Sequence, residues 1–174
     1  MPARFGSLVQ NGYVVRDLER SMEHWTRVVG VGPFFVLEHI QFGDVFLRGA
    51  PMKIDLTVGV AYWGEVQVEL IYQHDTAPSI YTEFAAEKGE GLQHVGVMTD
   101  SVERHLEELA QHGVKPVQWG ATAAGIRFAY LNTDQHPGGM IELIERGPAI
   151  DAFFSMAHDA ARNWDGRNPV RRLG

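Results

Sequence analysis

A glutamate within an apolar strand is the first sign of chemistry in this chain. Glu142 lies in the segment MIELIE, and alternate residues of a strand share one face. Met140 and Ile144 therefore flank Glu142, and a carboxylate among apolar side chains is costly unless it is paired or bound to a metal ion. Two explanations stay open from the strand pattern, an ion pair with an arginine such as Arg127 or a metal site.

A second strand, predicted over Glu65–Gln73, carries the related segment VQVELIY. One face of this strand is apolar and suits packing under helices. The opposite face is too polar for a dry core, so we expect it to line a water-filled cavity. The residues on the polar face are Gln67, Glu69, Ile71 and Gln73.

Two further polar residues occupy matching positions in two other predicted strands. Gln10 precedes Gly12 by two residues, and His94 precedes Gly96 by two residues. A lone histidine is more often structural than a ligand, but this one has a counterpart in the other half of the chain. Oxygen and nitrogen donors without thiolates suit Mg²⁺, Mn²⁺, Co²⁺, Ni²⁺, Fe²⁺ or Zn²⁺ with open water positions. The predicted donors are Gln10, Glu69, His94 and Glu142.

The elements that carry these residues form a βαβββ pattern that occurs twice. In the first half, a strand over residues 8–15 precedes a helix that Asp17 caps and Gly30 ends. Three strands follow, over residues 33–42, 54–62 and 65–73, and the last two are joined by a tight turn at Trp63-Gly64.

The second half repeats this plan with different loop lengths. The strand LQHVGVM precedes a helix for which Asp100 is the predicted N-cap, with Glu103 completing a capping box, and Gly113 follows the helix. Strands are predicted over residues 114–119, 125–132 and 140–145, with the last turn at residues 136–139. The fold class is therefore α+β, with two tandem βαβββ modules.

Two segments lie outside the repeat. Residues 78–88 are predicted to form a linker helix that ends at Gly89. Residues 150–164 are predicted to form a C-terminal helix capped by Asp151, which we expect to pack on the body or on a second subunit. The predicted divisions are residues 1–75 and 91–147 for the modules, 76–90 for the linker helix and 148–174 for the C-terminal helix and tail.

Composition narrows the class of protein. The chain has 174 residues and a formal net charge of −7, which argues against general nucleic-acid binding. The absence of cysteine excludes a disulfide framework and a thiolate nucleophile. With no long apolar run and no signal-peptide stretch at its start, the sequence predicts a cytoplasmic enzyme or binding protein without a membrane span.

The chain resembles the vicinal oxygen chelate superfamily, which includes glyoxalase I, methylmalonyl-CoA epimerase, extradiol dioxygenases and antibiotic-binding resistance proteins. The resemblance covers about residues 8–146. GEVQVELI and GGMIELIE resemble the family's two carboxylate-bearing strands, and PSIYTEFAAEKGEGLQHVGVMTD is most similar to the epimerase branch. The resemblance implies a curved mixed sheet around a cavity. It places the family's four metal ligands on Gln10, Glu69, His94 and Glu142. Gln10 departs from the usual histidine, and its amide is a poorer ligand for late transition metals.

The resemblance implies a divalent-metal-dependent isomerase, epimerase or lyase that stabilises an enolate of a small carbonyl or acyl-thioester substrate. Glu142 and Glu69 are the expected ligands and bases, and Asp55 is the second-choice base. One divalent ion (Co, Ni, Mn, Zn, Mg or Fe) and a homodimer are expected. The alternative is a metal-free, small-molecule-binding protein of the resistance type. Its cavity would be lined by Phe34, Phe35, Tyr62 and Trp119.

Overall fold

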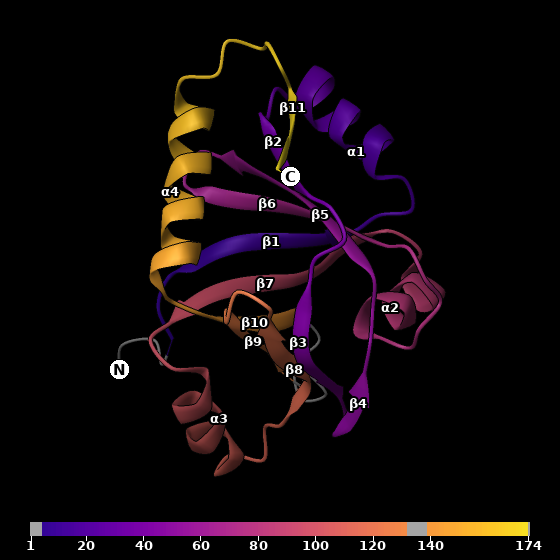
Figure 1. Cartoon of the computed structure of the whole chain (residues 1–174), viewed down its shortest axis with the longest axis vertical. Helices are drawn as coiled ribbons and strands as arrows, with labels where there is room; N and C mark the ends of the chain where they lie inside the picture. The colour runs from indigo at the N-terminus through magenta and orange to yellow at the C-terminus, as the bar shows by residue number, and fades with distance from the viewer. Residues whose placement is uncertain (1–4, 132–138, 174) are drawn as a thin grey trace.

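The protein is represented by a computed structural model that describes residues 5–131 and 139–173. In these residues eleven strands form one curved sheet, in the order β11-β2-β5-β6-β1-β7-β10-β9-β8-β3-β4 (Figure 1). The first half supplies β1 (Leu8–Val14), β2 (Phe34–Leu37), β3 (Phe42–Leu47), β4 (Ala50–Met52), β5 (Leu56–Trp63) and β6 (Val66–Gln73). The second half supplies β7 (Gly91–Thr99), β8 (Pro116–Thr122), β9 (Arg127–Leu131) and β10 (Met140–Glu145), and β11 (Val170–Leu173) follows near the C-terminus.

The strand order shows the duplication. The run β2-β5-β6-β1 in the first half is mirrored by β8-β9-β10-β7 in the second. The opening strands β1 and β7 pair antiparallel at the centre, and each pairs in parallel with the closing strand of its own half. The predicted α+β fold with a curved mixed sheet and a C-terminal helix is therefore confirmed.

Helices cover the sheet and its edges. They are α1 (Leu18–His24), α2 (Ile80–Lys88), α3 (Val102–Ala110) and α4 (Pro148–Arg162), and α1 continues as a π-helical segment over Trp25–Val29. The apolar face of β6 packs under α1, as predicted: Val68 and Leu70 join Leu18 and Met22 in one buried cluster. No helix in the described part of the chain is both long and apolar enough to cross a membrane.

The predicted strand over residues 33–42 is wrong in extent. β2 ends at Leu37, and β3 begins only at Phe42. The β3–β4 hairpin then pairs through β3 with β8, at the opposite end of the sheet from β2. β3 and β8 are neighbours in the sheet although they lie far apart in the sequence, and the local sequence does not encode such a pairing.

One predicted turn and one predicted helix cap are also corrected. The β5–β6 turn is Gly64-Glu65, because Trp63 pairs with Val66 and Gly64 has a φ of 61°. Ser101, not Asp100, caps α3 through its side chain, which accepts a hydrogen bond from the backbone N–H of Arg104.

The start of α4 is also earlier than predicted. Gly147 occupies the N-cap position, so Asp151 lies within the helix, where it pairs with Arg146. Asp17 and Gly30 bound the first helical segment as predicted, and Gly30 has a φ of 81°. The last predicted turn, at residues 136–139, lies mostly outside the described residues.

The C-terminal segment packs on the body of the same chain. α4 contacts β5, and Ala157 is fully buried. Figure 1 shows α4 running along one side of the sheet toward the first half, where β11 adds to the edge of β2 in parallel. Arg172 of β11 forms ion pairs with Glu19 and Glu38, which connect the C-terminal segment to the first half of the chain.

Candidate metal centre

The curved sheet and the first turns of α4 enclose a cavity of about 610 Å³. Most of its lining is apolar, and no lysine or arginine contributes to the lining described. Its charged or titratable residues are Glu38, His39, Glu69 and Glu142, together with two tyrosines. The aromatic residues of the lining are Phe42, Tyr81, Phe128, Tyr130, Phe153 and Phe154.

The four predicted donors come together at one side of this cavity, each from a different strand near the centre of the sheet. The Nε2 atom of His94 lies 3.2 Å from the amide oxygen of Gln10. The same atom lies 3.3 Å from a carboxylate oxygen of Glu142 and 3.6 Å from one of Glu69. Gln10 and His94 are buried, whereas the side chain of Glu69 retains 16% of its exposure.

The two repeated glycines explain how the donors fit. Gly12 lies between Glu69 and His94 on the neighbouring strands, and Gly96 lies between Gln10 and Glu142. A Cβ on Gly12 would lie 1.9 Å from the His94 ring, and one on Gly96 would lie 2.6 Å from the Gln10 amide oxygen. Each glycine therefore leaves the space that a donor from the other half occupies.

Two further glutamines orient the buried donors. The amide nitrogen of Gln10 donates a hydrogen bond to Gln67, which leaves the Gln10 oxygen facing His94. Nδ1 of His94 lies 2.8 Å from the amide oxygen of Gln93. Because that oxygen can only accept, Nδ1 carries the proton in this bond, and in the neutral ring Nε2 keeps a lone pair directed at the centre. This arrangement resembles the outer contacts that orient metal-binding histidines.

The centre is rich in acceptors and poor in positive charge. Two carboxylates, an amide oxygen and an imidazole nitrogen converge, and in residues 5–131 and 139–173 no lysine or arginine pairs with Glu69 or Glu142. Such a cluster repels itself unless a proton or a cation lies within it. The donor set therefore fits a divalent ion.

The pKa values of Glu69 and His94 reflect both burial and the charges that converge at the centre. Burial raises the pKa of Glu69 to about 7, the nearby charge of Glu142 adds to the rise, and His94 opposes it. Burial lowers the pKa of His94, but the hydrogen bond and charge of Glu142 and the charge of Glu69 outweigh it, so the pKa is raised overall. In the absence of a cation, the centre thus retains protons into the neutral range.

Two tyrosines, which were not predicted as site residues, lie beside the centre. The hydroxyl of Tyr81 donates to that of Tyr130 at 2.8 Å, and the Tyr130 ring meets the His94 ring edge-on at 5.1 Å. Burial, followed by the charge of Glu142, raises both pKa values well above 10, so both phenols stay protonated donors. Tyr81 comes from α2 and Tyr130 from β9, and no sequence spacing links the two.

Other expected contributors lie elsewhere. A carboxylate oxygen of Asp55 is hydrogen-bonded to Nδ1 of His39 at 2.7 Å, and Asp55 is not part of the four-donor centre. Arg127 pairs with Glu103, which excludes the proposed ion pair with Glu142 in this structure. The four aromatics expected around a cavity are not in its lining, because they pack in other layers of the fold: Phe34, Phe35, Tyr62 and Trp119.

Most of the other histidines lie away from the centre. His105 is buried and its ring contacts Phe5. His39 lines the cavity, and His136 lies outside the described residues.

Comparison with known proteins identifies the family of the chain. Residues 9–130 match the model of the glyoxalase/bleomycin resistance protein/dioxygenase superfamily. No curated protein sequence matches the chain.

Solved structures show the same fold. A hypothetical protein from Bacillus halodurans C-125 is 20% identical, with a TM-score of 0.61 over 81% of this chain and 94% of that one. Methylmalonyl-CoA epimerase from Mycobacterium tuberculosis is 19% identical, with a TM-score of 0.61 over 87% and 95%. A variant of Streptomyces coelicolor methylmalonyl-CoA epimerase, in complex with 2-nitronate-propionyl-CoA, is 16% identical, with a TM-score of 0.60 over 83% and 96%.

Proposed function

Because this chain belongs to the glyoxalase/bleomycin resistance/dioxygenase superfamily, we propose that it is a divalent-metal-dependent isomerase, epimerase or lyase. The observation that carries the proposal is the convergence of Gln10, Glu69, His94 and Glu142 on one side of a cavity, without a lysine or arginine partner among the described residues. Two carboxylates balance the charge of one divalent ion, and the open side of the centre faces the cavity.

The reaction class follows from the donors and their surroundings. A bound divalent ion supplies Lewis-acid polarisation of a substrate carbonyl, which stabilises an enolate. Glu69 is the better placed of the two glutamates to move the proton, because it is farther from His94 and its side chain is more exposed to the cavity. Tyr130, backed by Tyr81, provides a neutral hydrogen-bond donor beside the reacting atoms.

The cavity favours an apolar substrate body. Its described lining is mostly apolar, includes six aromatic residues and contains no lysine or arginine that would hold a phosphate. The structural neighbours include epimerases named for a CoA thioester. For this chain we favour a small apolar carbonyl compound, because the described lining offers no lysine or arginine to the phosphates of a thioester's nucleotide part.

Metal analysis tests the proposal. We expect His94→Ala and Glu142→Gln each to bind one divalent ion fewer per chain than the wild type, because each removes a donor. His24→Ala, which removes an exposed histidine of α1, serves as the matched control and should bind as many ions as the wild type. The proposal would be contradicted if the wild-type protein binds no metal and EDTA changes neither its stability nor its activity.

A metal-free binding protein is the second candidate, and the apolar cavity favours it. It predicts that apolar aromatic compounds raise the melting temperature equally in the wild type and in His94→Ala, with or without EDTA. The metal-dependent enzyme instead predicts that compounds with two adjacent oxygens bind only when the ion is present.

A further inference from the structure

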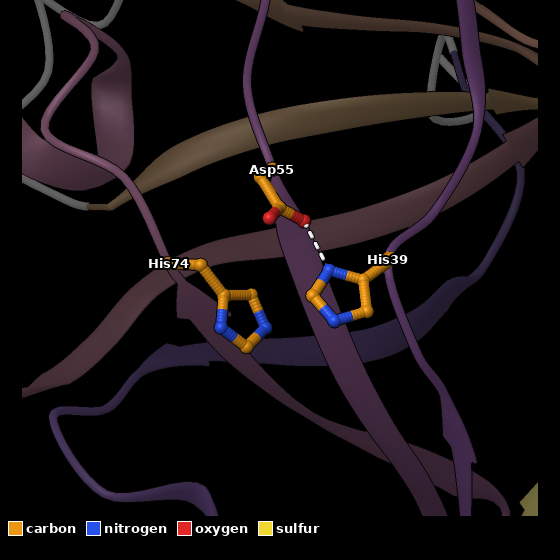
Figure 2. Close-up of side chains that lie close together, drawn as sticks. All are labelled: His39, Asp55 and His74. Carbon is orange, nitrogen blue, oxygen red and sulfur yellow. Dashed lines mark hydrogen bonds and ion pairs between the residues drawn. The ribbon is translucent and has the colours of Figure 1, made fainter.

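A second group of metal-ligating side chains lies at the rim of the cavity. His39, Asp55 and His74 offer donor atoms within 4.8 Å of one another (Figure 2). They share no residue with the four-donor centre, and the proposed function does not use them. Figure 2 shows the two imidazole rings side by side beneath the Asp55 carboxylate.

Three neighbouring strands bring these residues together at one edge of the sheet. Asp55 directly precedes β5 and His74 directly follows β6, and the backbone N–H of His74 donates to the carbonyl of Asp55 at 2.9 Å. His39 follows β2, the other neighbour of β5, and its backbone N–H donates to the Thr57 hydroxyl at 3.2 Å. The backbone therefore fixes the three positions independently of any ligand.

The side chains are arranged as a donor set. Nδ1 of His39 lies 2.7 Å from Asp55, and the rings of His39 and His74 are stacked with centroids 4.5 Å apart. The Thr57 hydroxyl, 2.8 Å from Nε2 of His74, adds an oxygen at the same place. His39 holds this position with a φ of 47°, a conformation that costs a non-glycine residue about 1 kcal/mol or more.

The local charge favours a cation. The carboxylate of Asp75 accepts from the backbone N–H of Asp55 at 3.0 Å, so a second acid lies beside the group. In residues 5–131 and 139–173 no lysine or arginine pairs with either Asp55 or Asp75. Two imidazoles with one carboxylate suit first-row divalent ions, and the exposed side chains leave room for water ligands.

We propose that His39, Asp55 and His74 form a second divalent-metal site, for an ion of the Zn²⁺, Co²⁺ or Ni²⁺ class, at the cavity rim. His39 belongs to residues 38–41, which line the cavity between β2 and β3. An ion at this site connects residues 38–41 of the cavity lining to the ends of β5 and β6. The rim site thus shapes the entrance to the cavity without touching the four-donor centre.

Titration of metal-stripped protein with Co²⁺ tests the rim site, with d–d absorption and calorimetry as readouts. Wild-type protein should bind two ions per chain. His74→Ala and Asp55→Asn should each lose one of them, or bind it at least tenfold more weakly. His24→Ala is the surface-histidine control and should bind two. Asp55→Asn preserves side-chain size, and circular dichroism checks that each variant is folded.

The outcomes separate the two sites. A wild type that binds one ion, lost in His94→Ala but unchanged in His74→Ala and Asp55→Asn, overturns the rim site and leaves the proposed function standing. One ion lost only in His74→Ala and Asp55→Asn supports the rim site and contradicts the four-donor centre. Two ions, each lost with its own set of variants, support both.

Discussion

At the scale of single residues, the centre is defined by groups that all accept hydrogen bonds. Nε2 of His94 faces two carboxylates and the Gln10 oxygen, while Gln93 holds the opposite ring nitrogen. A proton or a metal ion can relieve the repulsion among them. Protons and metal ions must therefore compete for this centre, and metal binding should strengthen as pH rises.

The first prediction concerns the pH dependence of stability in metal-free protein. The pKa of Glu69 is about 7 when folded against 4.5 ordinarily, so the folded state binds more protons than the unfolded chain between these values. Its contribution to stability is fully present below pH 4.5 and is lost as pH rises through about 7. The pKa of His94 is also raised in the folded state, so its protonation likewise stabilises the fold at low pH. This stabilisation is present below the ordinary pKa of histidine and is lost as the pH rises.

Urea unfolding in EDTA at pH 5 and pH 8 measures this effect. At about 1.4 kcal/mol per pKa unit, the Glu69 contribution to the loss between the two pH values is about 2–3 kcal/mol. The glutamine of Glu69→Gln cannot titrate, so this variant should lose about 2–3 kcal/mol less unfolding free energy than the wild type between pH 5 and pH 8. Equal losses in the wild type and Glu69→Gln would show that Glu69 is not the responsible group.

At the scale of elements, the central pair β1 and β7 determines the geometry of the centre. The second prediction is that Gly96→Ala weakens metal binding at least tenfold although every donor remains, because its Cβ would meet the Gln10 amide oxygen at 2.6 Å. Gly12→Ala should weaken it further and also destabilise the fold by about 1–3 kcal/mol, because the His94 ring it meets is fully buried.

Gly43→Ala in β3 is the matched control for these variants. Its Cβ would meet nothing closer than a backbone oxygen at 3.6 Å, an ordinary contact. Calorimetric titration with Co²⁺ and urea unfolding give the two readouts. Metal affinity of Gly96→Ala equal to that of Gly43→Ala would refute the role given to Gly96.

The third prediction concerns the start of α3. Ser101→Ala should lower the free energy of unfolding by about 1 kcal/mol, because its hydroxyl caps the helix by accepting from the Arg104 N–H. Asp100→Ala should change it much less, since the Asp100 side chain does not cap the helix. Urea unfolding of both variants checks this, and the reverse order would restore Asp100 as the cap.

At the scale of the whole molecule, the C-terminal segment completes the cavity. Ile150, Phe153 and Phe154 of α4 and Leu173 of β11 belong to the lining. The side chains that α4 contributes make the cavity more apolar than the sheet alone would. The homodimer expected from the sequence stays a prediction, for which sedimentation is the measurement.

The fourth prediction compares two ligands that present the same pair of oxygens. Benzohydroxamate should bind metal-loaded protein about 10–100-fold more tightly than acetohydroxamate, because burying its ring is worth about 1.5–3 kcal/mol. Calorimetry measures both affinities. Phe153→Ala, which opens the wall provided by α4, should reduce the difference. Equal affinities in the wild type would show that the apolar cavity does not receive the ligand.

Much of the fold and the candidate centre could be predicted from the sequence because both depend on local patterns. Alternation along β6 and β10 places Glu69 and Glu142 on the cavity face. The repeated spacing of Gln10 and His94 from their glycines identifies the other two donors. These features need only the period of a strand and the comparison of one half of the chain with the other.

Other features depend on the tertiary structure alone. The curvature of the sheet decides that β3 pairs with β8 and that Tyr81 meets Tyr130, across 49 residues of sequence. It also decides which aromatics face the cavity, and the alignment of three strand ends brings His39 to Asp55 and His74. The sequence by itself therefore determined the repeat and its four donors, because periodicity is local. Only the folded sheet decided what surrounds them, because its curvature arises from all the strands together.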